Sequence, residues 1–286
     1  MKATFGAVLC TAGLLAGCGG VPTDQPAAQD PSPMFGETKP MPEGYLQAQF
    51  WRPRTAPPPG RDIVVFNDVN IFIDFGAGIS SDPENQKLFR NLVNYAASGP
   101  RGSAREVWVD SGHGGDDCQG DCPDSEFAVF DSVVTAAGYS VVHKNTAVGD
   151  LTTLPASVKV LMLVNPLVAY TKAEVNAMKQ FAAEGGRVVF VGEHQGFYGA
   201  GIPIENDFLG KMGAVMRNVG NAVDCGKTKL PASSLRPAQV TTGLGGLALG
   251  CSSVIEPGPQ DFIFMFDTTN RLALAGVARI DTTPLP

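Results

Sequence analysis

The stretch from Val158 to Gln195 reads VKVLMLVNPLVAYTKAEVNAMKQFAAEGGRVVFVGEHQ, and it decides the fold. It opens with the apolar run 158–164 and closes with the apolar run 187–191. Short, continuous apolar runs are typical of strands that are covered on both faces. The two runs therefore predict two buried, parallel strands of one sheet.

The segment between these runs predicts a crossover helix from Thr171 to Glu184. Thr171 with Glu174 three residues later is the capping-box pattern, and Gly185-Gly186 is typical of a helix end. Parallel neighbours need a connection of this kind. The side chains at helical spacing from Thr171, which we expect to face the sheet, are Val175, Met178, Lys179 and Ala182.

The rest of the chain repeats this alternation before it changes. Strands are expected at 62–66, 106–110 and 139–143, a helix from the N-cap Asp82, and a helix from Asp124 or Ser125 to Ala137. A short helix is expected at 204–212, loops or short strands at 214–260, and paired strands at 262–266 and 272–279. This pattern predicts a three-layer α/β domain over residues 61–286, with a mostly parallel, doubly wound sheet and an antiparallel addition late in the chain.

Composition limits the classes of function. The chain has 286 residues, of which 44% are hydrophobic, so it can bury a sizeable core. Its formal net charge is −7 and its pI is about 5.0. An acidic chain is a poor candidate for binding nucleic acid by charge, so we expect no nucleic-acid partner.

Residues 1–17 have the composition of a signal peptide and end in Leu15-Ala16-Gly17-Cys18. This ending resembles the lipobox of bacterial lipoproteins, which implies cleavage before Cys18 and a lipid on its sulfur. Residue 19 is Gly rather than Asp, so the inner-membrane retention signal is missing, and we expect an outer-membrane anchor in the cell envelope. The alternative is an ordinary secretory signal with an incidental Cys. Residues 18–60 are rich in Pro and are expected to form a semi-stiff tether.

The layout from Arg105 to about Met212 resembles the class I glutamine amidotransferase-like fold, a relative of the flavodoxin-like fold. The likeness lies in a strand followed by a Gly-bearing loop, a strand ending in Asn165-Pro166, a helix ending in Gly-Gly, and a strand ending in a sharp turn. In branches of that family the segment that resembles 62–95 follows the last strand, whereas here it comes first. We therefore expect a circular permutation in which 62–66 pairs beside 272–279. The alternative is an ordinary doubly wound order.

The family's catalytic group is missing. The resemblance places a Cys nucleophile in the turn Gly192-Glu193-His194-Gln195-Gly196, which has neither Cys nor Ser, and no His follows His194. Glu193 and His194 could still act as an acid/base pair at the carboxyl ends of the strands. The alternative is a polar turn whose side chains cap the backbone.

The loop 110–126 is the second candidate site, because it is crowded with acidic residues. Hard divalent cations take several carboxylate oxygens, so Asp116, Asp117 and Asp121 are weak candidates for a metal site. The spacing does not match an EF-hand, and a solvated acidic loop is the alternative. We expect no other cofactor.

Four Cys remain after Cys10 leaves with the signal and Cys18 takes the lipid. An even number of Cys in an exported chain favours two disulfides, for which three connectivities are possible. We favour Cys118–Cys122 with Cys225–Cys251, because each of these pairs brackets one loop region. A zinc site of four thiolates lacks the usual paired spacing.

These observations predict a lipid-anchored envelope protein whose amidotransferase-like domain is catalytically silent and binds an envelope protein or a glycan. The alternative is an envelope hydrolase that uses an acid/base or metal site near His113, Glu193 and His194. The residues expected to line a ligand cleft are Asp110, Gly112, His113, Asn165, Glu193 and His194.

Overall fold

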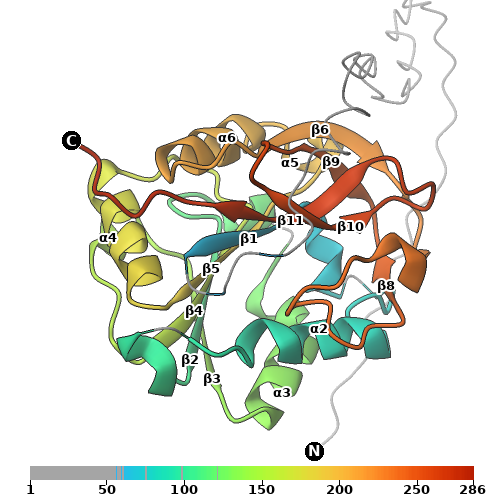
Figure 1. The fold of residues 1–286 in the computed structure, drawn as a ribbon, viewed down its shortest axis with the longest axis horizontal. Helices are drawn as coiled ribbons and strands as arrows, with labels where there is room; N and C mark the ends of the chain where they lie inside the picture. The colour runs from blue at the N-terminus through green and yellow to red at the C-terminus, as the bar shows by residue number, and fades with distance from the viewer. Residues whose placement is uncertain (1–55, 57–58, 60, 75, 98, 121) are drawn as a thin grey trace, which may run out of the picture. The chain divides into compact units, whose positions relative to one another are not determined.

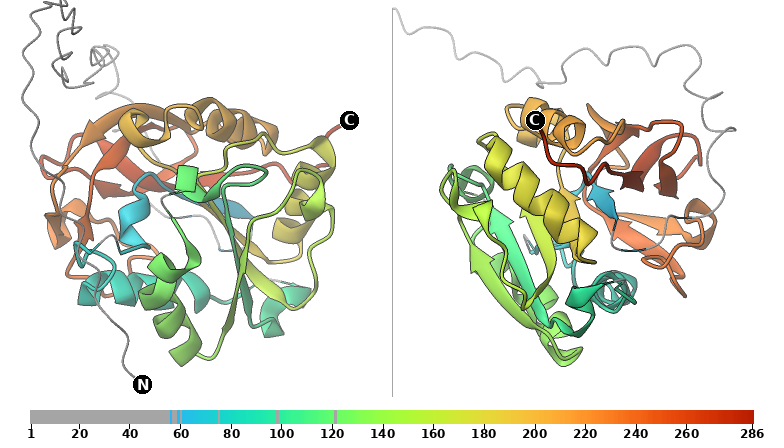
Figure 2. Two further views of the ribbon diagram at one scale, coloured as in Figure 1. Left: turned by 180° about the vertical axis from the view of Figure 1, so that it is seen from behind. Right: turned by 60° about the vertical axis from the view of Figure 1, so that its left-hand side comes forward.

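The structure is a computed structural model, and it describes residues 56, 59, 61–74, 76–97, 99–120 and 122–286, without the side chains of Asp117 and Gln119. Within these residues nine strands form one large sheet, in the order β3-β2-β4-β5-β1-β11-β9-β6 with β10 paired to β11. Helices cover both faces of its parallel part (Figures 1 and 2). The mixed α/β class is as predicted.

The parallel part contains five strands: β1 (Asp62–Phe66), β2 (Glu106–Ser111), β3 (Ser140–Lys144), β4 (Val158–Val164) and β5 (Arg187–Val191). Every residue of β1, β4 and β5 is buried, as expected of strands covered on both faces. The predicted strand–helix–strand unit is confirmed, because β4 and β5 pair in parallel from Val160–Arg187 to Val164–Val191.

The crossover helix of this unit is α4 (Lys172–Ala183), and its predicted capping box is present. Thr171 accepts a hydrogen bond from the backbone N–H of Glu174, and the Glu174 side chain accepts one from the N–H of Thr171. Lys179, expected on the inner face, is buried and donates through Nζ to the carbonyl oxygen of Thr283. A Lys can face inward here because the C-terminal segment crosses α4 and supplies an acceptor.

The other helices of the parallel part begin less regularly than expected. α2 (Pro83–Val93) has the predicted N-cap Asp82, which accepts from the N–H of Glu84. α3 (Ala128–Ala136) has no side-chain cap, because a 3₁₀ turn, η5 (Asp124–Phe127), precedes it. The expected cap at Asp124 or Ser125 is therefore wrong, and the Asp124 carboxylate lies 3.5 Å from Nδ1 of His143 instead.

The chain beyond β5 forms two short helices and the antiparallel part of the sheet. α5 (Gln195–Tyr198) and α6 (Ile202–Lys211) come first, and α6 starts two residues earlier than expected because Pro203 fits the first turn of a helix. The strands of the antiparallel part are β6 (Arg217–Val223), β9 (Ser252–Glu256), β10 (Phe262–Phe266) and β11 (Ala273–Arg279). A separate antiparallel pair is formed by β7 (Thr228–Pro231) and β8 (Gly246–Leu249).

The first and last strands of the domain are neighbours. β1 pairs with β5 in parallel on one side and with β11 antiparallel on the other, with Asp62 opposite Arg279 and Phe66 opposite Ala275 (Figure 1). The pairing predicted between 62–66 and 272–279 is confirmed. The pairing predicted between β10 and β11 is confirmed as well.

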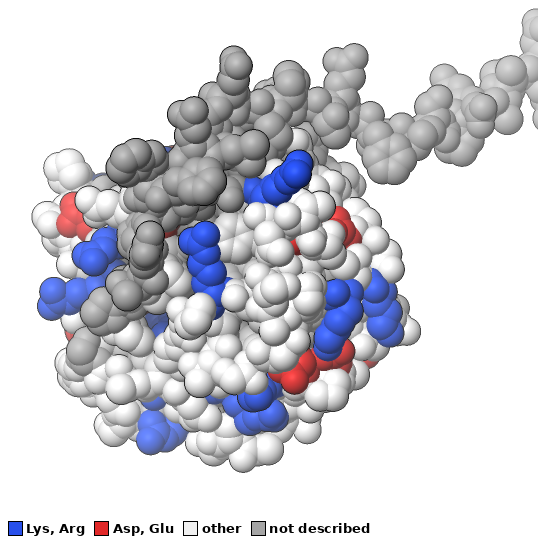
Figure 3. Space-filling model, turned by 45° about the vertical axis from the view of Figure 1, so that its right-hand side comes forward, with Lys and Arg blue, Asp and Glu red and all other residues white. Residues whose placement is uncertain are grey.

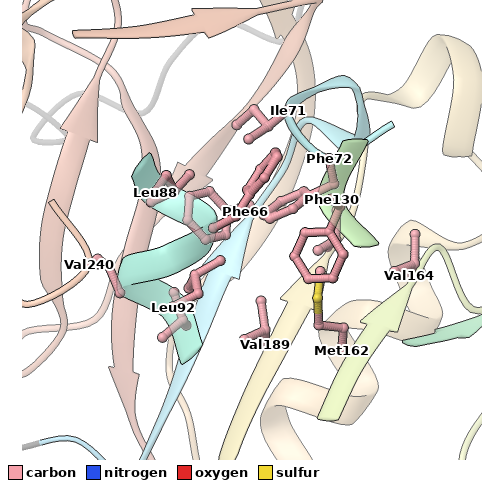
Figure 4. Close-up of a cluster of buried hydrophobic side chains, with 14 of the residues drawn as sticks. Phe66, Ile71, Phe72, Leu88, Leu92, Phe130, Met162, Val164, Val189 and Val240 are labelled. Carbon is pink, nitrogen blue, oxygen red and sulfur yellow. The ribbon is translucent and has the colours of Figure 1, made fainter. Parts of the chain in front are cut away.

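Each face of the parallel sheet has its own core, because alternate residues of a strand point to opposite faces. On one face Val64, Phe66 and Met162 pack against α2 and α3 (Figure 4). On the other face Ile63 and Leu161 belong to the cluster that also holds side chains of α4 and α6. This double cover explains the continuous apolar runs in the sequence.

The surface carries both signs of charge. In Figure 3, Lys and Arg side chains lie in separated groups, and Asp and Glu side chains stand beside some of them. Among the ion pairs of the described residues, Nζ of Lys229 lies 2.5 Å from the carboxylate of Asp82. None of the described helices has the length and the apolar character that a membrane span needs.

Candidate functional site

The four central parallel strands end at one edge of the sheet, which we call the carboxyl edge. The backbone N–H of Gly112 donates to Val164, that of Asn165 to Val191, and that of Gly192 to Phe66. These bonds, of 2.8–3.0 Å, extend the ladder of the sheet into the turns that follow β2, β4 and β5. Most of the residues predicted to line a cleft lie in these turns.

The turns after β2 and β4 hold strained backbone. His113 has a φ of 24° and Asn165 a φ of 42°, in the left-handed region that non-glycine residues rarely occupy. Gly112 and Gly114, on either side of His113, have φ values of 78° and 74°. The chain leaves β2 toward β3 and leaves β4 toward β5, in opposite directions. The strain therefore lies at the switch point of the parallel sheet, where open α/β sheets place ligands.

Around His113 lies a group of buried polar side chains, which we call the imidazole cluster and define as Asp110, His113, Thr146, Tyr170 and Glu174. Nδ1 of His113 is 2.7 Å from the Thr146 hydroxyl and 3.5 Å from Oδ2 of Asp110. Nε2 is 3.5 Å from Oε1 of Glu174, and the Tyr170 ring stacks on the imidazole at 4.2 Å between centroids. All five side chains are buried. The cluster therefore connects the end of β2, the loop after β3 and the start of α4 inside the protein.

The donors in this cluster can be assigned in order. The Thr146 hydroxyl donates to Oδ2 of Asp110, at 3.0 Å, and its backbone N–H donates to Oδ1. A hydroxyl has one proton, so Thr146 must accept from His113, and Nδ1 of His113 carries a hydrogen. Nε2 of His113 and the hydroxyl of Tyr170 make no hydrogen bond within the described part of the chain.

Glu174 connects this cluster to α4. Its carboxylate caps Thr171 and also accepts from the backbone N–H of Gly149 and of Leu151. Burial raises the pKa of Glu174, but the hydrogen bonds from Thr171 and Gly149 and the charge of His113 outweigh burial and hold that pKa below its usual value.

A second group, the carboxylate cluster, consists of Asp68, Glu193 and Glu205 with the amides Asn67 and Asn218. Glu193 accepts from the backbone N–H of Val69 at 3.0 Å and from that of His194 at 2.8 Å. Nδ2 of Asn218 donates to Oε2 of Glu205 at 2.7 Å, and Asn67, with its amide oriented to donate, reaches Oε1 at 3.0 Å. The cluster thus links the ends of β1 and β5 to α6 and β6.

Asp68 extends the cluster to the antiparallel part of the sheet. Its Oδ2 accepts from the backbone N–H of Gly250 and Cys251 and from the hydroxyl of Ser252. These bonds fix the segment that leads into β9 against the turn after β1.

The three carboxyl groups of the carboxylate cluster are buried, and burial favours their neutral forms. Burial raises the pKa of Asp68 to about 6 and that of Glu205 to about 8, against the hydrogen bonds that they accept. Burial, with the charges of Asp68 and Glu205, raises the pKa of Glu193 well above its usual value. The cluster therefore holds protons near neutral pH.

His194 acts as a helix cap. Its Nδ1 accepts from the backbone N–H of Gly196, at 3.0 Å, at the start of α5. Burial lowers the pKa of His194, which favours the neutral imidazole that this bond needs. Nε2 of His194 is 3.8 Å from Oε1 of Glu193.

The predicted cleft residues thus fall into two groups. Asp110, Gly112, His113 and Asn165 lie together at the ends of β2 and β4, while Glu193 and His194 lie in the turn after β5 and have other partners. Glu193 is 1% exposed and bound to backbone N–H groups. The geometry gives His113 and Glu193 separate partners, so it does not assemble them as an acid/base pair.

The loop 110–126 is closed by a disulfide. Cys118 bonds Cys122, and Cys225 bonds Cys251, so both predicted pairings are confirmed. Nδ2 of Asn165 lies 3.6 Å from Sγ of Cys118, which places this disulfide beside the switch point.

The described residues contain no group of three or more His, Cys, Asp and Glu side chains arranged for a metal. Asp116 is exposed. Asp121 and the Asp117 side chain lie outside the described residues, as does the predicted lipidation site Cys18. The predicted divalent cation therefore stays a prediction.

Several residues of these clusters gave no sequence signal of a site. Asp68 is the second residue after β1, so the rule that polar residues gather at strand ends could have found it. Glu205 and Asn218 belong to α6 and β6, far along the chain, and no spacing relates them to the carboxyl edge. Comparison with models of known families, with curated proteins and with solved structures finds no match to this chain.

Proposed function

We propose that this chain is a lipid-anchored protein of the cell envelope, whose domain resembles the class I glutamine amidotransferases but binds a partner or a glycan instead of catalysing a reaction. The lipobox ending at Cys18 supports the anchor. The residues at the carboxyl edge support the absence of catalysis. The main observation is that the Glu193 carboxylate is buried and bound to backbone N–H groups.

Glu193 occupies the position that the resemblance gives to the nucleophile, in the turn directly after β5. A nucleophile there needs a strained turn that exposes it to substrate and to backbone donors. Glu193 instead is buried, its φ lies outside the left-handed region, and its carboxylate is occupied by two backbone N–H groups. A side chain held in this way stabilises the turn and cannot attack a carbonyl group.

The strand order supports the amidotransferase-like and flavodoxin-like assignment and its circular permutation. Counted from β2, with β1 placed last, the five parallel strands lie in the order 2-1-3-4-5, which is the flavodoxin-like order. β1 then takes the fifth place, next to β11. To undo the permutation, the segment that begins with β1 would be joined to the end of β11. Because β1 and β11 are neighbours, with Asp62 opposite Arg279, a short connection would suffice.

The anchor is tested by labelling cells that express the full chain with an alkyne analogue of palmitate. We expect the label on the wild-type chain and on Cys10→Ser, the matched control, and its loss from Cys18→Ser. Equal labelling of Cys18→Ser would contradict the anchor.

The catalytic silence is tested separately with glutaminase and general esterase, amidase and glycosidase substrates. We expect no turnover above background from the full chain. Turnover that Glu193→Gln abolishes and Glu256→Gln, an exposed control, retains would overturn the proposal. Crosslinking the anchored protein to intact envelopes would identify what it binds.

A further inference from the structure

A pocket of about 310 Å³ lies at the end of the sheet opposite the carboxyl edge. One wall is the second half of α4, with Ala177, Gln180 and Phe181. The other wall is the segment before β4, which includes the 3₁₀ turn η6 (Asp150–Thr152). The volume is at the lower end of the range for small-molecule sites, which suits one or two ring-sized units.

Arg101 forms the base of the pocket but is not available to a ligand. Its guanidinium donates to the carbonyl oxygens of Leu154, Pro155 and Val158 and to the carboxylate of Glu184. It also lies over the Phe181 ring, 4.5 Å from the centroid. The charges of Arg101 and Glu184 are paired at 2.8 Å, so the pocket offers no net charge to an ionic ligand.

The rim of the pocket has uncommitted polar atoms. The hydroxyls of Thr152 and Thr153, both exposed, make no side-chain hydrogen bond to the described part of the chain. Gln180 donates through Nε2 to Oε1 of Glu184, which leaves its carbonyl oxygen free to accept. Together with the remaining lone pairs of Glu184, these groups are rich in acceptors.

We propose that this pocket binds a neutral saccharide unit. An acceptor-rich pocket without net charge fits a ligand that has many donors and no charge, and sugar hydroxyls are such donors. The small apolar side chains between the polar groups, Ala156 and Ala177, fit the C–H faces of a sugar ring. This inference rests on the proposed binding function, narrows its ligand to a glycan, and moves the site away from the buried carboxyl edge.

The test titrates the full chain with neutral monosaccharides and disaccharides, such as glucose, N-acetylglucosamine and maltose, and follows binding by saturation-transfer NMR. Ala177→Trp fills the pocket and is expected to abolish the signal. Ala173→Trp, on the same helix but exposed and outside the pocket, is the matched control and is expected to keep it.

A gentler variant guards against misfolding. The double substitution Thr152→Val and Thr153→Val keeps the shape and removes both hydroxyls, and is expected to weaken binding about fivefold to tenfold, as for the loss of one or two hydrogen bonds. Thr135→Val, on the exposed side of α3, should change nothing. Glucuronate should bind more weakly than the neutral sugars, because its carboxylate brings a negative charge to a site that is rich in acceptors.

The outcomes separate this inference from the proposed function. No saturable binding of any neutral sugar, or binding that Ala177→Trp leaves unchanged, overturns the pocket inference. If the anchored chain still captures an envelope glycan or protein and the pocket variants do not affect that capture, the binding function stands and the pocket inference fails.

Discussion

The carboxylate of Glu193 accepts a hydrogen bond from the backbone N–H of Val69, at 3.0 Å. The two residues are 124 positions apart, and the bond ties the turn after β5 to the turn after β1. In an enzyme of the family that the sequence resembles, the first of these turns would be kept open for chemistry. Here a buried hydrogen bond holds this turn against the turn after β1. The contribution of such buried contacts to stability can be measured.

The carboxylate cluster predicts that stability falls as pH rises. Glu205, with its pKa raised to about 8, and Asp68, with its pKa raised to about 6, keep protons in the folded state that the unfolded chain releases near pH 4. The free energy of unfolding should therefore decrease from about pH 4 to about pH 8, by on the order of several kcal/mol. Urea denaturation at pH 5, 7 and 9 measures this. A free energy that rises from pH 5 to pH 9 would contradict it.

Glu205→Gln should remove part of this slope, because an amide resembles the protonated carboxyl group and does not ionise. We expect the variant to match the wild type within about 1 kcal/mol at pH 5 and to be more stable than the wild type at pH 9. Glu256→Gln, at an exposed position of β9, is the control and should leave the slope unchanged.

The two disulfides should contribute unequally. Cys225–Cys251 closes a loop of 26 residues and Cys118–Cys122 one of 4. Replacing both Cys of the first bridge by Ser should lower the free energy of unfolding by about 3.5 kcal/mol, by the entropy of loop closure. The same change at the second bridge should lower it by about 2 kcal/mol. Chemical denaturation of both double variants, beside non-reducing peptide mapping of the wild type, checks this. Free thiols at all four positions in the wild type would rule the bridges out.

Glu174 should contribute more to the free energy of unfolding than its role in the helix cap alone would give. Thr171→Ala removes the bond that the Thr171 hydroxyl accepts from the N–H of Glu174 and the bond that it donates to the Glu174 carboxylate, and is expected to cost about 1 kcal/mol. Glu174→Ala also leaves the N–H groups of Gly149 and Leu151 without their acceptor, and is expected to cost about 2–3 kcal/mol. Ala173→Ser, in the same turn, should lie within 0.5 kcal/mol of the wild type. Equal losses for Thr171→Ala and Glu174→Ala would show that the η6 contacts add nothing.

The hydrogen on Nδ1 of His113 can be observed directly. Long-range ¹⁵N–¹H NMR should show Nδ1 protonated, as the donor order through Thr146 to Asp110 requires. Thr146→Val breaks this order and buries two polar groups without a partner, so we expect a loss of about 1–3 kcal/mol. Thr135→Val, at an exposed position, is the control. An Nδ1 without hydrogen in the wild type would contradict the assignment.

Sequence patterns predicted the elements correctly where the stabilising interactions are between residues close in the chain. The apolar runs of β4 and β5, the capping box of α4 and the N-cap Asp82 depend on neighbours within a few residues, and all are present. The same reasoning was wrong at the start of α3. There the 3₁₀ turn η5 takes up residues 124–127, so α3 begins only at Ala128 and has no side-chain cap.

The sequence by itself determined the α/β class, because apolar periodicity is a property of short segments. The pairing of the first strand with the last was predicted from the resemblance to a family, and the spacing of the four Cys favoured one of three possible disulfide connectivities. Only the tertiary structure decided the state of the polar residues at the carboxyl edge. Glu193 and Asp68 are buried and accept hydrogen bonds from residues more than a hundred positions away in the chain. His113 is buried among side chains that come from β2, from the loop after β3 and from the start of α4. No pattern in the sequence predicts that a carboxylate is desolvated when β6 and β9 pack over it.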